Sequence, residues 1–242
     1  MRRIVLAALA VSAFSAGAIE NLSAQDILRM MYSPVPIINW TGFYVGGNFG
    51  YGWARTTDTP NGILEPQGSW HQKGVLGGVQ GGFNIQSGMG VFGFETDFQL
   101  TAQKATTTTP GSFLGLPVTF NDTYQVPWFG TARARAGVAA DRVFIYGTGG
   151  LAYGEIRSDR YISGSVTGIF HHSQVRFGWV AGAGVEMMTT PNWTWRFEYL
   201  HYDLGSFDQV YIVTVGGTST NVMLNSRFTN DLVRVGVNYI IR

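Results

Sequence analysis

The stretch that most constrains this chain is residues 42–53, which read GFYVGGNFGYGW. Its odd-numbered positions are mostly large and apolar, whereas its even-numbered positions are mostly small or polar. Because side chains alternate between the two faces of a strand, this pattern predicts a β-strand about a dozen residues long. Strands of soluble proteins usually have about 5–6 residues, whereas a strand that crosses a bilayer needs about 9–11, with apolar side chains facing outward. The stretch therefore predicts one strand of a membrane-spanning barrel.

The same alternation recurs in seven further segments along the chain. They cover residues 74–86, 91–103, 124–138, 143–156, 174–188, 193–204 and 228–241. Pro127 lies near the expected start of the fourth strand, where a missing amide is tolerated. Together with residues 42–53, these segments predict an all-β fold of eight strands.

The connections between these segments alternate between long and short. Polar loops are expected at residues 54–73, 104–123, 157–173 and 205–227, and tight turns at 87–90, 140–142 and 190–192. The four threonines 106–109 are expected to be a solvated part of the second loop. Bacterial outer-membrane barrels have an even number of strands, short periplasmic turns and long external loops, and closure removes the unpaired edges that lipid cannot hydrate. The alternation of long and short connections therefore predicts an eight-stranded antiparallel up-and-down transmembrane β-barrel.

Composition supports a β-protein with a large apolar surface. Glycine accounts for 33 of the 242 residues and aromatic residues for 14%, whereas charged residues reach only 13%. Soluble domains have about 25% charged residues, so this balance fits a soluble enzyme poorly. The net charge of +1 lacks the basic excess typical of nucleic-acid binding. The absence of cysteine excludes a disulfide framework and a thiolate metal site.

The N-terminus has the pattern of an export signal. Two arginines precede an apolar run over residues 4–18, which ends in the small residues Ala-Gly-Ala. The run is too short for the roughly 20 residues of a transmembrane helix, so it predicts a signal peptide over 1–18, with an alternative cleavage after 24. Residues 19–39 are interpreted as a periplasmic lead-in and 40–242 as the outer-membrane β-barrel.

Charged residues within the predicted strands fall largely on the face opposite the apolar row. These four acids and four arginines are Glu95, Asp97, Arg133, Arg135, Glu186, Arg196, Glu198 and Arg234. Because an eight-stranded barrel is only wide enough to be filled by side chains, we expect them to pair across the lumen. Counting from the expected strand ends puts Glu198 opposite Arg234. A structural ion-pair core is the favoured interpretation, and a proton or ion path is the alternative.

Aromatic residues near the strand ends are typical of girdles at the two membrane interfaces. Trp53 and Trp128 lie near the expected loop ends, and Trp193 and Tyr239 near the turn side. We therefore interpret these four residues as an aromatic girdle.

Five segments, in order, resemble the small porin-like, outer-membrane immunogenic protein family of Gram-negative bacteria. They read NWTGFYVGG from residue 39, WFGTAR from 128, GWVAGAGVE from 178, EYLHYDLG from 198 and VRVGVNY from 233. The resemblance covers residues 40–242 and implies a surface-exposed eight-stranded barrel without agreed catalytic residues. It also implies outer-membrane lipids, lipopolysaccharide and the barrel-insertion machinery as partners. Members usually end on an aromatic residue, whereas this chain has Ile241 at that place, followed by Arg242.

Two other groups of residues are candidates for a metal site and for a catalytic site. His171 and His172 are adjacent, but two histidines lack the further ligands that a metal site needs, so no metal and no cofactor are expected. His201, Asp203 and Ser206 could serve a lipid hydrolase, although spacing alone does not establish a serine–histidine–acid geometry. We therefore expect a structural, non-enzymatic surface protein with a closed lumen. The alternatives are a narrow porin-like channel for small solutes and a lipid-modifying hydrolase.

Overall fold

The computed structural model describes residues 38–61, 68–113, 116–164, 167–215 and 218–242. The expected signal peptide and nearly all of the expected lead-in lie outside the described residues. The described residues from Ile38 to Arg242 form one compact unit. It consists of the strands β1 (Gly42–Asn61), β2 (Gly68–Ser87), β3 (Gly90–Phe113), β4 (Leu116–Ala140), β5 (Val143–Gly164), β6 (Gly168–Met188), β7 (Trp193–Val215) and β8 (Thr218–Ile241).

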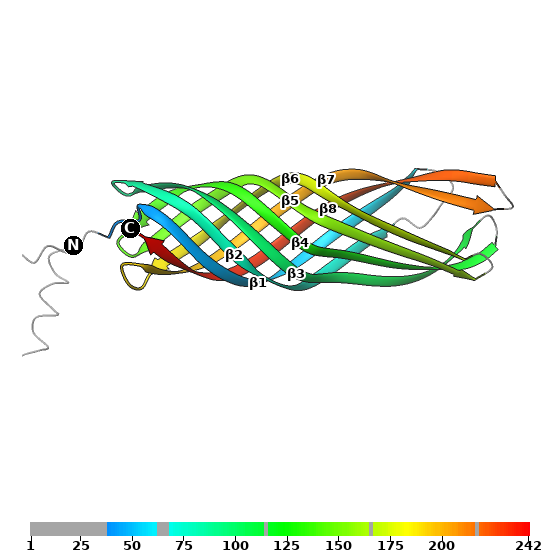
Figure 1. Ribbon diagram of the computed structural model, residues 1–242, viewed down its shortest axis with the longest axis horizontal. Helices are drawn as coiled ribbons and strands as arrows, with labels where there is room; N and C mark the ends of the chain where they lie inside the picture. Colours follow the sequence, from blue (N-terminus) through cyan, green and yellow to red (C-terminus); the bar gives the residue numbers. More distant parts are fainter. Residues whose placement is uncertain (1–37, 62–67, 114–115, 165–166, 216–217) are drawn as a thin grey trace, which may run out of the picture. The chain divides into compact units, whose positions relative to one another are not determined.

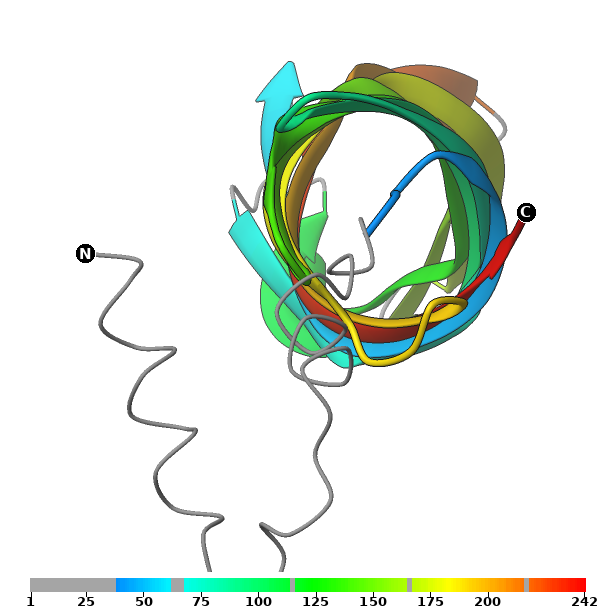
Figure 2. The same ribbon diagram turned by 90° about the vertical axis from the view of Figure 1, so that its left-hand side faces the viewer.

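The strands form a closed antiparallel barrel in sequence order (Figures 1 and 2). Each strand pairs with the next along the chain, and β8 pairs with β1 to close the ring, for example Val45 with Tyr239. The predicted fold class is thereby confirmed. Closure leaves no edge strand, so every strand has a backbone partner on both sides. No helix among the described residues is long and apolar enough to cross a membrane.

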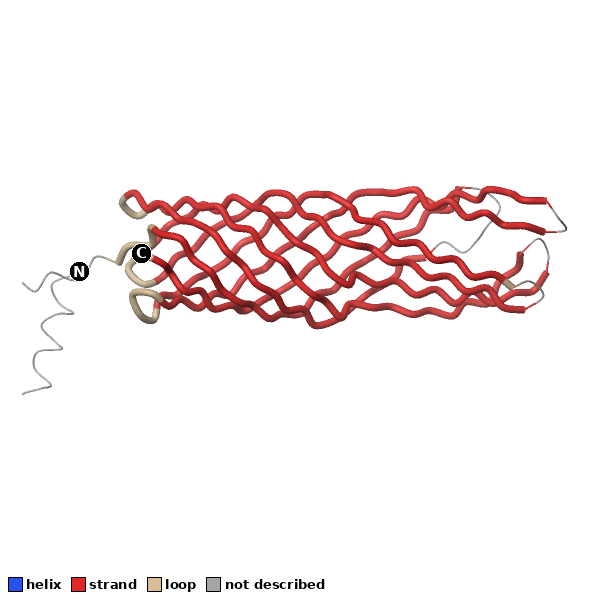
Figure 3. Tube along the Cα trace, viewed as in Figure 1, coloured by secondary structure: helices blue, strands red, loops and turns tan. Residues whose placement is uncertain are grey.

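The prediction of four long loops is wrong for most of their residues. The strands continue through residues 54–61, 68–73, 104–113, 116–123, 157–164, 168–173, 205–215 and 218–227. Figure 3 shows tight turns at one end of the barrel and long strand pairs at the other. Thr106 pairs with Thr123, and Thr108 Oγ1 donates to Asn121 Oδ1 at 2.7 Å. Threonine favours strands because it is β-branched. The sequence pattern missed these extensions because they lack a regular apolar outward row.

The two faces of the barrel wall differ as the alternation predicts. Along β1, the odd-numbered Phe43, Val45 and Phe49 are exposed by 53–64%. The even-numbered Tyr44 lies inside and is 2% exposed. A bilayer would cover this outward apolar face, whereas the inward face is buried by the protein itself.

Two strands change the face on which their odd-numbered residues lie. In β4, the odd-numbered Phe129 and Thr131 are buried on the turn side of Pro127, whereas the even-numbered Tyr124 and Val126 are buried on the side of the strand extension. Pro127 falls within a register shift between Gln125 and Phe129, not near the start of the strand as expected.

The second change is in β7, where the register shifts between Asp203 and Ser206. Gly205 has φ = 76° there, a conformation that glycine adopts without a Cβ clash. Both shifts lie where the long strand extensions begin.

Candidate functional site

The barrel interior is the candidate functional site, and it begins with an apolar cluster at the turn end. Trp40, which precedes β1, is completely buried, and its ring lies 5.4 Å from that of Phe144. In the end view, the segment ahead of β1 runs inside the ring (Figure 2). The buried members of this inner cluster are Trp40, Tyr44, Val91, Ala139, Phe144, Tyr146, Met188 and Ile240.

A charged layer follows in the middle of the barrel. Its members are the eight residues that the sequence alternation puts on the inward face, and each is no more than 3% exposed. They project from β3, β4, β6, β7 and β8: Glu95, Asp97, Arg133, Arg135, Glu186, Arg196, Glu198 and Arg234. The structure therefore brings together carboxylates and guanidinium groups from five strands in one place.

Arg234 lies near the centre of this layer. It is opposite Glu198 in the β7–β8 register, as the strand spacing predicts. Its Nε lies 2.7 Å and its Nη2 2.6 Å from Glu198 Oε2, and Nη2 also lies 2.9 Å from Asp97 Oδ2. One guanidinium therefore links β8 with β7 and with β3 across the lumen, and the planar fork of arginine suits such contacts.

Arg133 makes a second link across the lumen. It pairs with Glu95, lies 3.0 Å from Asp97 Oδ2 and reaches Glu198 Oε1 at 3.2 Å. Since Arg234 contacts the same carboxylates, the two arginines share their partners. The charges form a network instead of isolated pairs, so losing one member alters the contacts of several others.

Two tyrosines that the sequence analysis did not select as site residues connect the inner cluster to the charged layer. Tyr44 donates its hydroxyl to Glu95 Oε2 at 2.7 Å, and Tyr146 donates to Glu198 Oε1 at 2.8 Å. Arg135 stacks over the Tyr44 ring at 4.6 Å and pairs with Glu186 at 3.0 Å. Tyr44 and Tyr146 occupy even-numbered positions of β1 and β5, which face inward, and this was the signal in the sequence that could have identified them.

A second apolar cluster lies beyond the charged layer, toward the strand extensions. Phe129 and Tyr202 have ring centroids 4.9 Å apart, and Phe228 lies 6.1 Å from Tyr202. The buried members of this outer cluster are Ala54, Leu76, Val126, Phe129, Ala152, Ile156, Val180, Leu200, Tyr202, Leu204, Phe228 and Leu232. Buried amides lie at the same level, since Asn230 Nδ2 donates to Gln103 Oε1 at 2.9 Å and to the Tyr202 hydroxyl at 2.6 Å. The interior therefore changes from an apolar to a charged level and then to a level of mixed apolar and amide side chains.

The four residues interpreted as an aromatic girdle lie on the outer wall. Trp53, Trp193 and Tyr239 are 39–48% exposed, and the rings of Trp193 and Tyr239 lie 5.1 Å apart. Trp128 is half-buried, and its Nε1 donates to Glu155 Oε2 at 2.7 Å. Their contact with the membrane interfaces stays a prediction.

His201 has a carboxylate partner, but among the described residues it bonds no serine hydroxyl. His201 Nδ1 lies 2.8 Å from Asp231 Oδ1. Asp203 instead pairs with Arg227 at 2.6 Å and accepts the amide of Gly205 at 2.8 Å. His171 Nδ1 lies 2.7 Å from Asp159. Within the described parts of the chain, no group of three or more metal-ligating side chains comes together.

Comparison with known proteins bears on the class of this barrel. The chain matches the sequence model of the outer membrane protein beta-barrel domain over residues 6–240. The chain belongs to this family. Membership confirms the suspected type of barrel and identifies the protein as a component of the outer membrane.

The chain is similar to two named outer-membrane proteins of Brucella and to a solved barrel from Pseudomonas aeruginosa. A 31 kDa outer-membrane immunogenic protein of Brucella melitensis is 33% identical, with 99% of both chains covered. A 25 kDa outer-membrane immunogenic protein of Brucella abortus is 29% identical, with 98% of this chain and 95% of the relative covered. The crystal structure of the outer membrane protein OprG from Pseudomonas aeruginosa is 9% identical, with a TM-score of 0.47 over 84% of this chain and 97% of that one.

Proposed function

We propose that this outer-membrane barrel is a structural, surface-exposed protein with a closed lumen and no enzymatic activity. The observation that carries the proposal is the filling of the interior at three successive levels: the inner cluster, the charged layer and the outer cluster. The interior of an eight-stranded barrel is just wide enough for side chains to fill.

Each level hinders passage for a different reason. The inner and outer clusters fill the interior with buried rings such as those of Trp40, Phe144 and Phe129, so a hydrated ion would have to lose much of its water shell to enter. In the charged layer, Arg133 and Arg234 share the carboxylates of Asp97 and Glu198. A passing ion would have to displace these buried contacts.

Conductance in planar lipid bilayers tests the closed lumen. The folded, signal-free protein should insert without stable open steps, and an open porin in the same bilayer setup serves as the positive control. Stable open steps that scale with the amount of inserted protein would support the narrow channel and contradict the closed lumen.

We infer an orientation in which the three tight turns face the periplasm and the strand extensions project outside the cell. Short periplasmic turns and longer external segments support this orientation in a bacterial barrel. The extensions beyond the charged layer would then present Thr106, Thr108 and their partners to the surroundings. This orientation also puts Tyr239 and Ile241 near the periplasmic mouth, where the insertion machinery would read the C-terminal strand.

The lipid-hydrolase alternative has a separate test. Expression of the protein should leave the masses of outer-membrane lipids unchanged, because among the described residues His201 bonds Asp231 and no serine hydroxyl that could act as nucleophile. A mass change that appears with the wild type and disappears with His201→Ala would contradict the non-enzymatic proposal.

A further inference from the structure

Three exposed cations lie together on the outer wall, where β1, β2 and β3 leave the apolar band. Lys73 is directly opposite Lys104 in the β2–β3 register and directly opposite Trp53 in the β1–β2 register. Arg55 is two residues beyond Trp53 and therefore lies on the same outward face. Opposite Cβ atoms in antiparallel strands are about 4.5–5.5 Å apart and diagonal ones about 7–8 Å, so the three side chains can reach one ligand. We call Arg55, Lys73 and Lys104 the outer cation cluster.

Among the residues that the structure describes, the cluster has no acidic partner of its own. In the described part of the chain, none of its three members makes an ion pair or hydrogen bond from its side chain. Asp231 is opposite Trp53 and so diagonal to Arg55, but its carboxylate is bound by Tyr199 at 2.5 Å and by His201 at 2.8 Å.

Cations at a similar level on other strands differ from the cluster. Arg157 on β5 pairs with Glu155 at 2.6 Å, and Arg227 on β8 pairs with Asp203 at 2.6 Å. Like charges directly opposite each other in a sheet are destabilising. The Lys73–Lys104 pair is therefore unfavourable in the protein alone, and an anion between the two ammonium groups would remove the cost.

The wall below the cluster is apolar and exposed. On β2, Val75 and Val79 are 46% and 63% exposed, and on β3, Phe98 and Leu100 are 42% and 62% exposed. An inorganic anion would make no favourable contact with such an apolar surface. An anion that carries acyl chains would contact both the cations and this wall.

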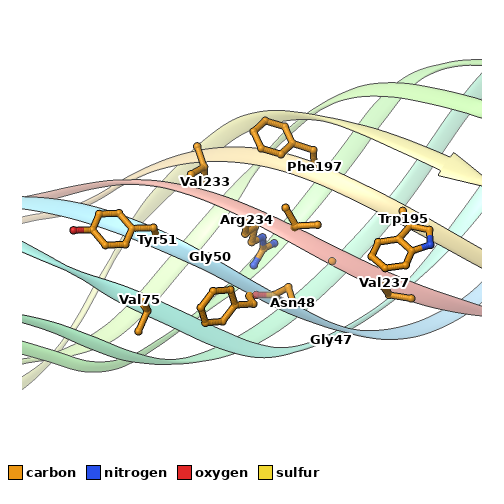
Figure 4. Close-up of a pocket in the computed structure, with 13 residues that line it drawn as sticks. Gly47, Asn48, Gly50, Tyr51, Val75, Trp195, Phe197, Val233, Arg234 and Val237 are labelled. Carbon is orange, nitrogen blue, oxygen red and sulfur yellow. The ribbon is translucent and has the colours of Figure 1, made fainter.

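A groove on the outer wall begins beside the cluster. Its volume is about 670 Å³, within the roughly 300–1,000 Å³ of small-molecule sites. Figure 4 shows Tyr51 and Val75 at one end and Trp195 at the other. Tyr51 precedes Trp53 by two residues and Val75 follows Lys73 by two, so this end lies next to the outer cation cluster.

The groove exists because β1 carries a glycine on its outward face there. A Cβ at Gly47 would have its nearest neighbour, the carbonyl oxygen of Gly78, 3.7 Å away. The space above Gly47 is thus open, and Phe197 and Val233 form part of the surrounding wall.

We propose that the outer cation cluster and the adjoining groove bind one phosphorylated glycolipid of the outer leaflet. Its phosphates contact Arg55, Lys73 and Lys104, and one acyl chain lies in the groove over Gly47. This proposal rests on the orientation proposed above, which brings the cluster to the outer-leaflet headgroups. It does not depend on whether the lumen conducts.

Lipid binding by the full, folded barrel in detergent tests the site. The probe is diphosphoryl lipid A, and bound lipid is measured by native mass spectrometry over a titration. The triple variant Arg55→Gln, Lys73→Gln, Lys104→Gln should bind roughly 100-fold more weakly, because each cation near anionic lipid contributes about fivefold. The matched control Arg157→Gln removes an exposed cation that already has a carboxylate partner, and it should bind as the wild type does.

Two further arms separate the phosphate from the acyl contribution. Dephosphorylated lipid A should bind the wild type about as weakly as the triple variant binds the intact lipid, and inorganic phosphate should not compete at matched phosphate concentration. Gly47→Phe fills the groove from an open position, and it should weaken lipid binding without changing the heat-dependent gel mobility that reports folding.

Three results would overturn the proposal. The first is equal lipid binding by the triple variant and the wild type. The second is an equal loss in Arg157→Gln, which would mean that overall charge and not this site controls binding. The third is full competition by inorganic phosphate, which would make the acyl groove irrelevant. None of these measurements depends on conductance. Stable open steps in the planar-bilayer test would therefore contradict the closed lumen without contradicting this lipid site.

Discussion

Replacing Arg234 by methionine tests whether the charged layer holds the barrel together. Methionine keeps much of the side-chain length but removes the guanidinium that contacts Glu198 at 2.6 Å and Asp97 at 2.9 Å. The layer then contains four carboxylates and three guanidinium groups, all buried. Removing one partner of a buried pair costs about 3–5 kcal/mol because the remaining charge is left uncompensated.

This cost predicts a large shift in stability. For a domain of roughly 150–250 residues, each kcal/mol lowers the melting temperature by about 2–4 °C. Arg234→Met should therefore melt about 6–20 °C below the wild type. The measurement is the loss of folded-band gel mobility on heating in detergent, together with urea unfolding in lipid vesicles followed by tryptophan fluorescence.

A second substitution separates charge imbalance from loss of packing. Adding Glu198→Gln to Arg234→Met restores equal numbers of acids and arginines, so the double variant should regain about 0.5–3 kcal/mol relative to additivity. Arg157→Met breaks an ion pair whose arginine is 50% exposed, and it should change the midpoint little. An unchanged midpoint for Arg234→Met, or a loss equal to that of Arg157→Met, would refute the reasoning about the buried network.

Two further predictions concern packing and orientation. Gly50→Ala brings a methyl group against the carbonyl oxygen of Val233 and to 2.8 Å from the Cβ of Arg234 on β8, so it should cost about 1–3 kcal/mol in urea unfolding. Gly81→Ala, whose nearest neighbour would be 3.6 Å away on the outer wall, is the matched control and should be neutral. Because the chain has no cysteine, Thr108→Cys should react with a membrane-impermeant maleimide in intact cells, whereas Met89→Cys should react only after the outer membrane is opened. Labelling of Met89→Cys in intact cells would contradict the proposed orientation.

The membrane half of this barrel could be predicted from the sequence because a bilayer imposes a strict pattern. Apolar residues must face outward, so the alternation indicated both the strands and the inward face of Glu198 and Arg234. The number of residues between strand ends then predicted that these two side chains lie opposite each other. The same argument did not extend past the bilayer, where water covers the outer wall and no apolar row is required.

The supporting residues of the interior were harder to predict. Tyr44 and Tyr146 share the inward face with glycines, and only the structure shows that their hydroxyl groups reach Glu95 and Glu198. One member of the outer cluster was missed for another reason. In β4 the inward residues change from odd to even numbers at Pro127, so a pattern continued from Phe129 assigns Val126 to the wrong face.

The shifts at Pro127 and Gly205 divide β4 and β7 each into two segments whose side chains alternate in opposite phase. An insertion of a single residue normally reverses the inside and outside of everything beyond it in a strand. In β4 and β7 the register is already adjusted where the extensions begin, and the charged layer lies on the other side of that adjustment. The β3–β4 and β7–β8 hairpins can therefore gain or lose residues beyond these shifts, and change what they present, while the arginines and carboxylates keep their places.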